Sequence, residues 1–169
     1  MSKSEVWFYT GPRNCGKSEQ AEQKLSSINN RIYFGTIIDC FENIEIIKRH
    51  KQRRDDRWIL LETSTFLLSD IGVIRSEINR IDGECACLID GLTSWLASTT
   101  PQINNILHNS KILSSLIVDL INSYTNVIWV LIDVTPNEFY EHETIYSLAC
   151  DSLYKNILNE LEAVYLVNY

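Results

Sequence analysis

A short glycine motif between a hydrophobic run and a helix-forming segment constrains the fold of this chain more than any other feature. Residues 11–18 read Gly-Pro-Arg-Asn-Cys-Gly-Lys-Ser, a full match to the pattern G-x-x-x-x-G-K-[ST]. A predicted strand, residues 6–10, precedes the motif directly, and the polar segment from Glu19 onward is typical of a helix. In this strand–loop–helix order, backbone N–H groups curl around phosphate oxygens at a helix N-terminus. The sequence therefore predicts a phosphate-binding loop (P-loop).

Hydrophobic runs alternate with helical patterns along the chain, and the runs are mostly unbroken, which is typical of strands covered on both faces. We predict strands at residues 6–10, 32–37, 58–63, 85–90, 127–132 and 164–167, and helices that begin near residues 17, 43, 66, 103 and 140. The fourth helix has the clearest apolar stripe: Ile112, Leu113, Leu116, Ile117, Leu120 and Ile121. The predicted fold class is α/β, a single P-loop nucleotide-binding domain over residues 1–169 with a largely parallel sheet flanked by helices. Ligands in such sheets bind at the carboxyl ends of the strands.

Composition and charge exclude several other classes of protein. The 169 residues are 45% hydrophobic and 22% charged, which fits one folded domain and excludes a disordered chain. The net charge of -7 disfavours nucleic acid and anionic membranes as partners. Five cysteines without a C-x-x-C pair indicate reduced thiols rather than a zinc site or a disulfide framework. The N-terminus lacks a signal-peptide pattern and no apolar run approaches the ~20 residues of a membrane span, so we expect a cytoplasmic protein.

The chemistry of the glycine motif calls for a cation beside the phosphates and an acid beside a metal ion. Lys17 is placed to reach the terminal phosphates of a nucleotide, and the Ser18 hydroxyl is a ligand for Mg²⁺. Asp90 ends the predicted strand 85–90 and would emerge beside the motif, where it completes the Mg²⁺ site. The alternative role for Asp90 is to cap the segment 92–96 that follows it.

A dense basic segment follows the second predicted strand. Six of the fifteen lysines and arginines lie between positions 48 and 57: Lys48, Arg49, Lys51, Arg53, Arg54 and Arg57. On an acidic chain this cluster indicates a local polyanion site such as a triphosphate, and the alternative is a solvated helix face. His50 lies within it and is a candidate nucleophile toward phosphorus, since imidazole is neutral near pH 7; the alternative is an ordinary surface histidine. Trp58 is either core or a wall on which a base stacks.

The order of further residues resembles a known family. The glycine motif is followed by Phe34-Gly35-Thr36, then by His50, by Arg54, Trp58 and Glu62 at intervals of four, and by the Asp-x-Leu-Thr-x-Trp-Leu segment from Asp90. Over roughly the first hundred residues the chain resembles the bifunctional adenosylcobinamide kinase / adenosylcobinamide-phosphate guanylyltransferase family of cobalamin biosynthesis. The second half is divergent: the family's Asn-Glu-Val-Gly loop is replaced, and no arginine follows Arg80.

The resemblance implies a two-step activity on a corrinoid substrate. GTP or ATP with Mg²⁺ would phosphorylate adenosylcobinamide, with Lys17 and Asp90 as catalytic groups, and GMP would then be transferred through a guanylylated His50. By matching position, the nucleotide site corresponds to Gly11, Pro12, Arg13, Asn14, Cys15, Gly16, Lys17, Ser18, Phe34, Gly35, Thr36, Lys51, Gln52, Arg53, Arg54, Glu62 and Asp90. Glu62 suits hydrogen bonds from guanine, and the family precedent implies a homotrimer. The alternatives are a plain small-molecule kinase, or a nucleotide-binding module without guanylyl transfer.

Overall fold

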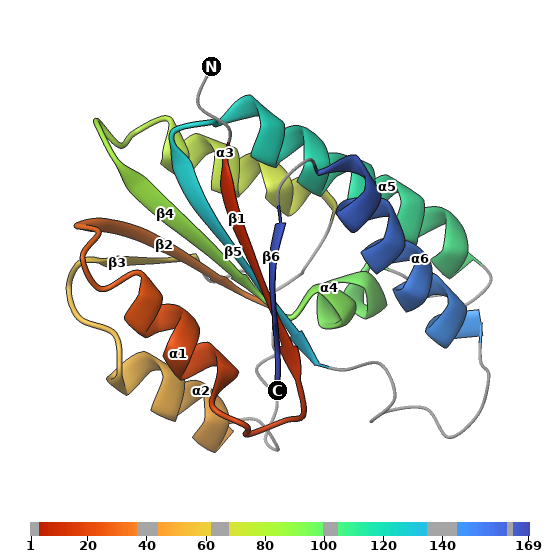
Figure 1. Cartoon of the computed structure of the whole chain (residues 1–169), viewed down its shortest axis with the longest axis horizontal. Helices are drawn as coiled ribbons and strands as arrows, with labels where there is room; N and C mark the ends of the chain where they lie inside the picture. Colours follow the sequence, from red (N-terminus) through yellow and green to blue (C-terminus); the bar gives the residue numbers. More distant parts are fainter. Residues whose placement is uncertain (1–3, 37–43, 62–67, 100–104, 135–144, 162–163) are drawn as a thin grey trace.

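Six parallel strands form one sheet in the computed structural model of the chain (Figure 1), which describes residues 4–36, 44–61, 68–99, 105–134, 145–161 and 164–169. The strand order is β3-β2-β4-β5-β1-β6, and every neighbouring pair is parallel. The strands are β1 (Glu5–Gly11), β2 (Asn30–Gly35), β3 (Trp58–Leu61), β4 (Cys85–Asp90), β5 (Val127–Val134) and β6 (Val164–Asn168). All six predicted strands and the parallel α/β fold class are confirmed.

Helices cover both faces of the sheet. They are α1 (Lys17–Lys24), α2 (Ile44–Gln52), α3 (Ile71–Ile78) after the 3₁₀ turn η2 (Leu68–Asp70), α4 (Leu92–Ser98), α5 (Ile106–Ser123) and α6 (Ile145–Glu160). Figure 1 shows α1 and α2 on one side and α3, α4, α5 and α6 on the other. The predicted start at residue 17 is confirmed, whereas those near 43, 66, 103 and 140 lie outside the described residues. In the part of the chain that the structure describes, no helix has the length and apolar character needed to cross a membrane.

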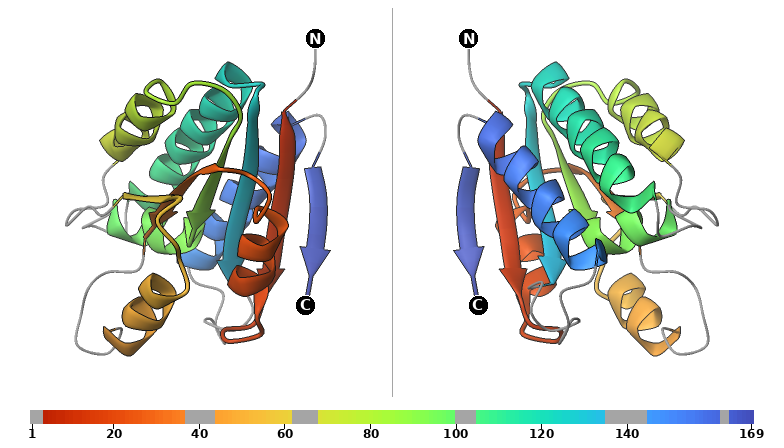
Figure 2. Two further views of the ribbon diagram at one scale, coloured as in Figure 1. Left: turned by 90° about the vertical axis from the view of Figure 1, so that its left-hand side faces the viewer. Right: turned by 90° about the vertical axis from the view of Figure 1, so that its right-hand side faces the viewer.

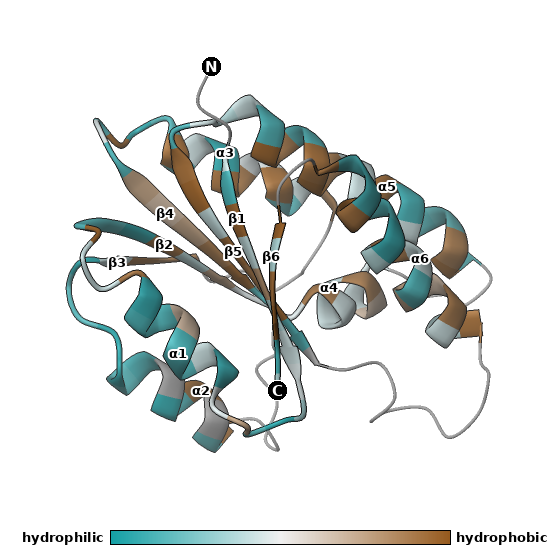
Figure 3. Ribbon diagram, in the orientation of Figure 1, coloured by the Kyte–Doolittle hydropathy of each residue, from teal (hydrophilic) through white to brown (hydrophobic). Residues whose placement is uncertain are grey.

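The hydrophobic core is divided by the sheet into two layers. On the α5 side, Leu113, Ile117, Leu120 and Ile121 of the predicted stripe are fully buried, while Ile112 and Leu116 lie at its half-buried margin. Figure 3 shows this apolar side of α5 against the sheet. On the opposite side, a smaller cluster joins α1 to the sheet. All six residues of β4 are buried, as expected of a central strand covered on both faces.

The carboxyl ends of the strands meet at one edge of the sheet, which brings together segments far apart in sequence. In Figure 2 the strand arrows point toward the turn between β1 and α1, and α2 lies at the same level. Thr36, just after β2, is bonded to the end of β4: its amide and its hydroxyl each donate to the Asp90 carbonyl at 3.0 Å. The Thr36 hydroxyl also donates to the Gly91 carbonyl. These bonds fix the loop around Asp90.

The helix α4 begins directly after this edge. It was not among the helices predicted from the sequence, where residues 92–96 were named only as a segment that Asp90 could cap. Its cap is supplied by Asp133 of β5, whose carboxylate accepts 2.8 Å hydrogen bonds from the Thr93 amide and the Thr93 hydroxyl. A buried carboxylate at a helix N-terminus satisfies an orphan N–H group and complements the helix dipole. The α4 cap that was the alternative role for Asp90 therefore belongs to Asp133.

Gly91 requires glycine both for its backbone conformation and for lack of space, whereas Gly83 requires it for its backbone conformation alone. Both have left-handed backbones, with φ of 98° and 96°, but a Cβ on Gly91 would lie 2.5 Å from the buried Thr36 Oγ1, while one on Gly83 would meet no heavy atom within 4 Å. We expect Gly83→Ala to lower the free energy of unfolding by about 1–2 kcal/mol through backbone strain. We expect Gly91→Ala to cost about 2 kcal/mol more through overpacking. Urea unfolding of both variants checks this, and equal losses would contradict it.

Candidate phosphate-binding site

The loop between β1 and α1 has the backbone conformation that the glycine motif predicted. Asn14 and Gly16 have positive φ values of 60° and 90°, and Gly16 is the N-cap of α1. Its carbonyl accepts the first helical bond, from the Gln20 amide at 3.0 Å. The chain thereby turns directly into a helix N-terminus, where unpaired N–H groups and the helix dipole favour an anion.

The Lys17 side chain is held inside this loop. It is 7% exposed, and its ammonium group donates a 2.7 Å hydrogen bond to the Pro12 carbonyl on the opposite side of the loop. An ammonium group that is buried this deeply needs anionic or carbonyl oxygen partners. The loop therefore places a positive charge where the oxygens of a bound phosphate would lie.

The topology brings Ser18 and Asp90 together, as expected from the sequence. The Ser18 hydroxyl lies 3.3 Å from Asp90 Oδ2, across a separation of 72 residues. Burial raises the pKa of Asp90 above its usual value, and the neighbouring Arg54, Tyr33, Ser18 and Lys17 act in the opposite direction without cancelling that effect. A hydroxyl and a carboxylate converging beside a phosphate loop are hard oxygen ligands of the kind that Mg²⁺ takes.

Tyr33 belongs to this cluster, although it was not selected from the sequence. Its hydroxyl lies 3.2 Å from Asp90 Oδ2, and burial raises the pKa of Tyr33 well above its usual value, so the phenol is the proton donor. The Arg54 guanidinium lies 3.3 Å over its ring. A tyrosine between two buried apolar residues, Ile32 and Phe34, requires a partner for its hydroxyl, and that was the available signal.

Two neighbouring residues of β2 lie differently from Tyr33. Phe34 is fully buried on the opposite face of the sheet, where its ring packs against Trp95 at 4.8 Å, because successive strand residues point to opposite faces. Its side chain is therefore part of the core and not of the cluster around Asp90. Gly35 lies beside the Tyr33 ring: a Cβ there would come within 2.6 Å of Tyr33 Cε1.

The end of the basic segment is anchored on the helix that follows the loop. The Arg54 side chain is 2% exposed and its Nη2 donates to Glu22 Oε1 of α1 at 2.7 Å, while Arg53 Nε lies 3.4 Å from Glu22 Oε2. Arg57, in contrast, pairs with Asp55 at 2.6 Å. Glu22 was not selected from the sequence, because a glutamate in a polar helix carries no signal of its distant partners. These ion pairs fix the chain after α2 next to α1.

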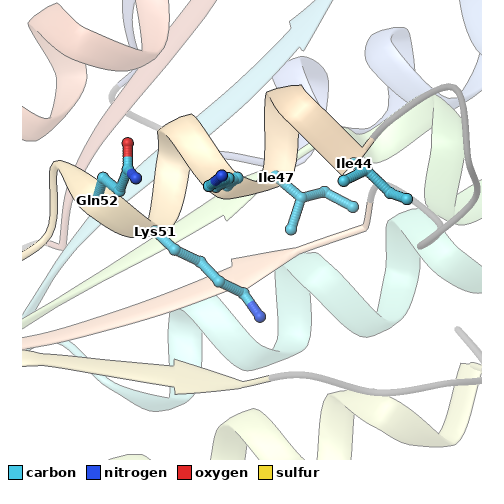
Figure 4. Close-up of a pocket in the computed structure, with 5 residues that line it drawn as sticks. Ile44, Ile47, Lys51 and Gln52 are labelled. Carbon is cyan, nitrogen blue, oxygen red and sulfur yellow. The ribbon is translucent and has the colours of Figure 1, made fainter.

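One side of α2 lines a pocket of about 550 Å³, bounded by Ile44, Ile47, Lys48, Lys51 and Gln52. Figure 4 shows Ile47 and Lys51 extending from the same side of the helix, and Gln52 extending from another side. Apolar and cationic side chains are thus combined on one surface. The basic segment is neither wholly a polyanion cluster nor wholly a solvated face: part of it pairs with Glu22 and Asp55, and part lines this pocket.

His50, Glu62 and Trp58 are the remaining residues that were considered for the site. His50 lies in α2, three and four residues before the two arginines that pair with Glu22, and its side chain is outside the described residues. Glu62 is also outside the described residues. Trp58 is 8% exposed and packs edge-on to Tyr33 with ring centroids 6.4 Å apart, so it is part of the core.

Comparison with known proteins gives a family and a fold. The model of the family described as "Cobinamide kinase / cobinamide phosphate guanyltransferase" matches residues 7–168, so the match extends through the divergent second half. No curated protein matches the chain. A solved structure of an ATPase domain is similar over 98% of this chain and 70% of that chain, with a TM-score of 0.59 and 11% identity, which shows the fold alone. Another, "Structure of Drosophila ORC bound to DNA", covers 98% and 79% at 8% identity, and its TM-score of 0.39 is too low to carry an argument.

The Glu22–Arg54 ion pair predicts a large effect from a small substitution. Glu22→Gln keeps the side-chain shape but leaves the buried guanidinium without its carboxylate on α1, so we expect the free energy of unfolding to fall by about 2–4 kcal/mol. Glu19→Gln, on an exposed position of the same helix, is the matched control and should change it by less than about 1 kcal/mol. Urea unfolding measures both. Similar values for the two variants would contradict the anchoring role of Glu22.

Proposed function

Because the chain belongs to the cobinamide kinase / cobinamide phosphate guanyltransferase family, an enzyme family of cobalamin biosynthesis that joins phosphotransfer to nucleotidyl transfer, we propose that this protein performs both steps with His50 as the covalent carrier of GMP. The observation that carries the proposal is the convergence of Lys17, Ser18 and Asp90 at the phosphate loop. It supports a site at which a nucleoside triphosphate is anchored next to the helix that contains His50.

In the proposed kinase step, the loop binds the triphosphate and orients its γ-phosphoryl group toward the cobinamide hydroxyl. The hydroxyl oxygen attacks γ-phosphorus, the bond to the β,γ-bridging oxygen breaks, and the hydroxyl proton is released. Lys17 neutralises charge on the phosphoryl oxygens, while backbone N–H groups of the loop hold the other phosphates. Ser18 and Asp90, whose oxygens lie 3.3 Å apart, would hold Mg²⁺, which when bound neutralises phosphate charge. We propose ATP or GTP as the phosphoryl donor.

In the proposed guanylyl step, a ring nitrogen of His50 attacks the α-phosphorus of GTP. The new N–P bond forms as the bond to pyrophosphate breaks. A phosphate oxygen of cobinamide phosphate then attacks the same phosphorus, and the N–P bond breaks to release the free imidazole. Division into two displacements allows one site to serve both reactants in turn. The ion pairs of Arg53 and Arg54 with Glu22 support this role, because they hold the end of α2 beside α1.

The proposal extends to the substrates and to the assembly of the enzyme. The pocket along α2 combines isoleucines with Lys48 and Lys51, which suits an apolar ring system that carries a phosphate group. We propose it as part of the corrinoid site, and Glu62 as an acceptor for the guanine N–H groups. From the family precedent we propose a homotrimer, which sedimentation equilibrium would measure directly.

Covalent labelling tests the carrier role of His50. Incubation with GTP radiolabelled at the α-phosphate is expected to leave a label that is stable to alkali and lost in acid, as for a phosphoramidate, and His50→Ala should abolish it. His108→Ala, an exposed histidine of α5, is the matched control and should keep the label. A wild-type protein that phosphorylates cobinamide but takes up no label would be a plain kinase. Nucleotide binding without either product would indicate a binding module.

The buried carboxylate of Asp90 predicts opposite effects on stability and on activity. Since burial raises the pKa of Asp90, ionisation of this group at neutral pH costs folding free energy, and Asp90→Asn removes that cost. We expect the nucleotide-free variant to melt at a higher temperature than the wild type. Its Mg²⁺-dependent phosphoryl transfer should fall at least about 100-fold. Calorimetry and a kinase assay check the two arms, and a variant that keeps full activity would exclude Asp90 from the site.

A further inference from the structure

We propose that Tyr33 is a positioning residue that holds the Asp90 carboxylate in the orientation needed to bind a Mg²⁺–nucleotide, and that Gly35 provides the space for its ring. The inference rests on the proposed function of Asp90 as a metal ligand. Neither Tyr33 nor a spatial role for Gly35 followed from the sequence or from the resemblance.

Two hydroxyl groups donate hydrogen bonds to the same oxygen of Asp90. Oδ2 of Asp90 lies 3.2 Å from the Tyr33 hydroxyl and 3.3 Å from the Ser18 hydroxyl. Tyr33 is on β2 and Ser18 is on α1, so the two donors approach the same oxygen from different elements. Two donors from rigid elements restrict the rotation of a carboxylate, and such partners of metal-binding groups typically change metal affinity when removed.

Gly35 leaves room for the Tyr33 ring because it has no side chain. A Cβ on Gly35 would lie 2.6 Å from Tyr33 Cε1 and 2.9 Å from the Tyr33 hydroxyl oxygen, so any side chain here would displace the ring. The described glycines with positive φ are Gly11, Gly16, Gly83 and Gly91, so the requirement at Gly35 is one of space. The absence of a side chain at this position lets the phenol reach β4, the neighbouring strand.

Arg54 and Trp58 pack against the Tyr33 ring. The Arg54 guanidinium carbon lies 3.3 Å from the centroid of the Tyr33 ring, and the Trp58 ring packs edge-on to it with the two ring centroids 6.4 Å apart. The ring is therefore fixed by a stacked cation and by an aromatic neighbour, and it is only 9% exposed. Since Arg54 also pairs with Glu22, the ring contacts both the proposed metal ligand and the anchor of α2.

The test separates the hydroxyl from the ring. Tyr33→Phe removes the hydrogen bond to Asp90 and keeps the surface on which Arg54 stacks, whereas Tyr33→Leu removes both. Binding of a fluorescent nucleoside triphosphate is titrated against Mg²⁺ for each variant, with thermal melting in parallel. We expect Tyr33→Phe to raise the half-saturating Mg²⁺ concentration about tenfold, with unchanged nucleotide binding in EDTA and a melting temperature lowered by about 2–4 °C, because the buried carboxylate loses one donor. Tyr33→Leu should show the same change in Mg²⁺ dependence together with a clearly larger fall in melting temperature, because the stacking surface is lost as well.

Two further variants make the outcome decisive. Tyr9→Phe alters a buried tyrosine of β1 in the same apolar cluster and should titrate with Mg²⁺ like the wild type. Asp90→Asn should abolish the Mg²⁺ effect. If Asp90→Asn acts as expected but Tyr33→Phe titrates like the wild type, the positioning role is overturned while the proposed function stands. If the wild type shows no Mg²⁺-dependent nucleotide binding, the proposed function itself fails.

Discussion

The placement of one carboxylate at the end of a fully buried strand is the constraint on which the rest of this site depends. Asp90 ends β4, the strand that lies between β2 and β5, and every residue of β4 is buried. A charge in that position requires hydrogen-bond donors and nearby cations. The donors come from Ser18 and Tyr33, and the nearby cations are Arg54 and Lys17. The phosphate loop, β2 and the segment after α2 are thus arranged around a single acidic group.

The same arrangement explains how the proposed two-step transfer is compatible with a rigid sheet. The loop and Asp90 belong to β1, α1 and β4, which are parts of the packed core. The helix that contains His50 is instead connected through side chains, since Arg53 and Arg54 reach Glu22 and Arg54 stacks on Tyr33. The segment after α2 is therefore tied to the core by ion pairs and stacking, contacts that exchange more readily than strand pairing.

The sequence predicted what depends on local pattern and on the general geometry of parallel sheets. Unbroken apolar runs located all six strands, and the meeting of carboxyl ends at one edge was enough to expect Ser18 beside Asp90. Side-chain contacts between elements that are distant in the sequence could not be predicted, because they depend on how those elements pack. Glu22 pairs with arginines more than thirty residues away, and Asp133 rather than Asp90 caps α4 because β5 lies next to β4. Phe34 was expected to line the nucleotide site by its position in the sequence, and the alternation of strand residues, which places its side chain in the core on the opposite face from Tyr33, was not considered.

The hydrogen bond from Lys17 to the Pro12 carbonyl bears on how the loop receives a ligand. Because the ammonium group is already buried and hydrogen-bonded, an arriving phosphate does not have to order a flexible four-carbon chain, which typically costs on the order of 1–2 kcal/mol. The incoming oxygen has only to replace a neutral carbonyl as acceptor, and the charged acceptor forms the stronger bond. Recognition at this loop is therefore an exchange of partners on a prearranged cation, and its enthalpy should depend on the charge of the ligand more than on its shape.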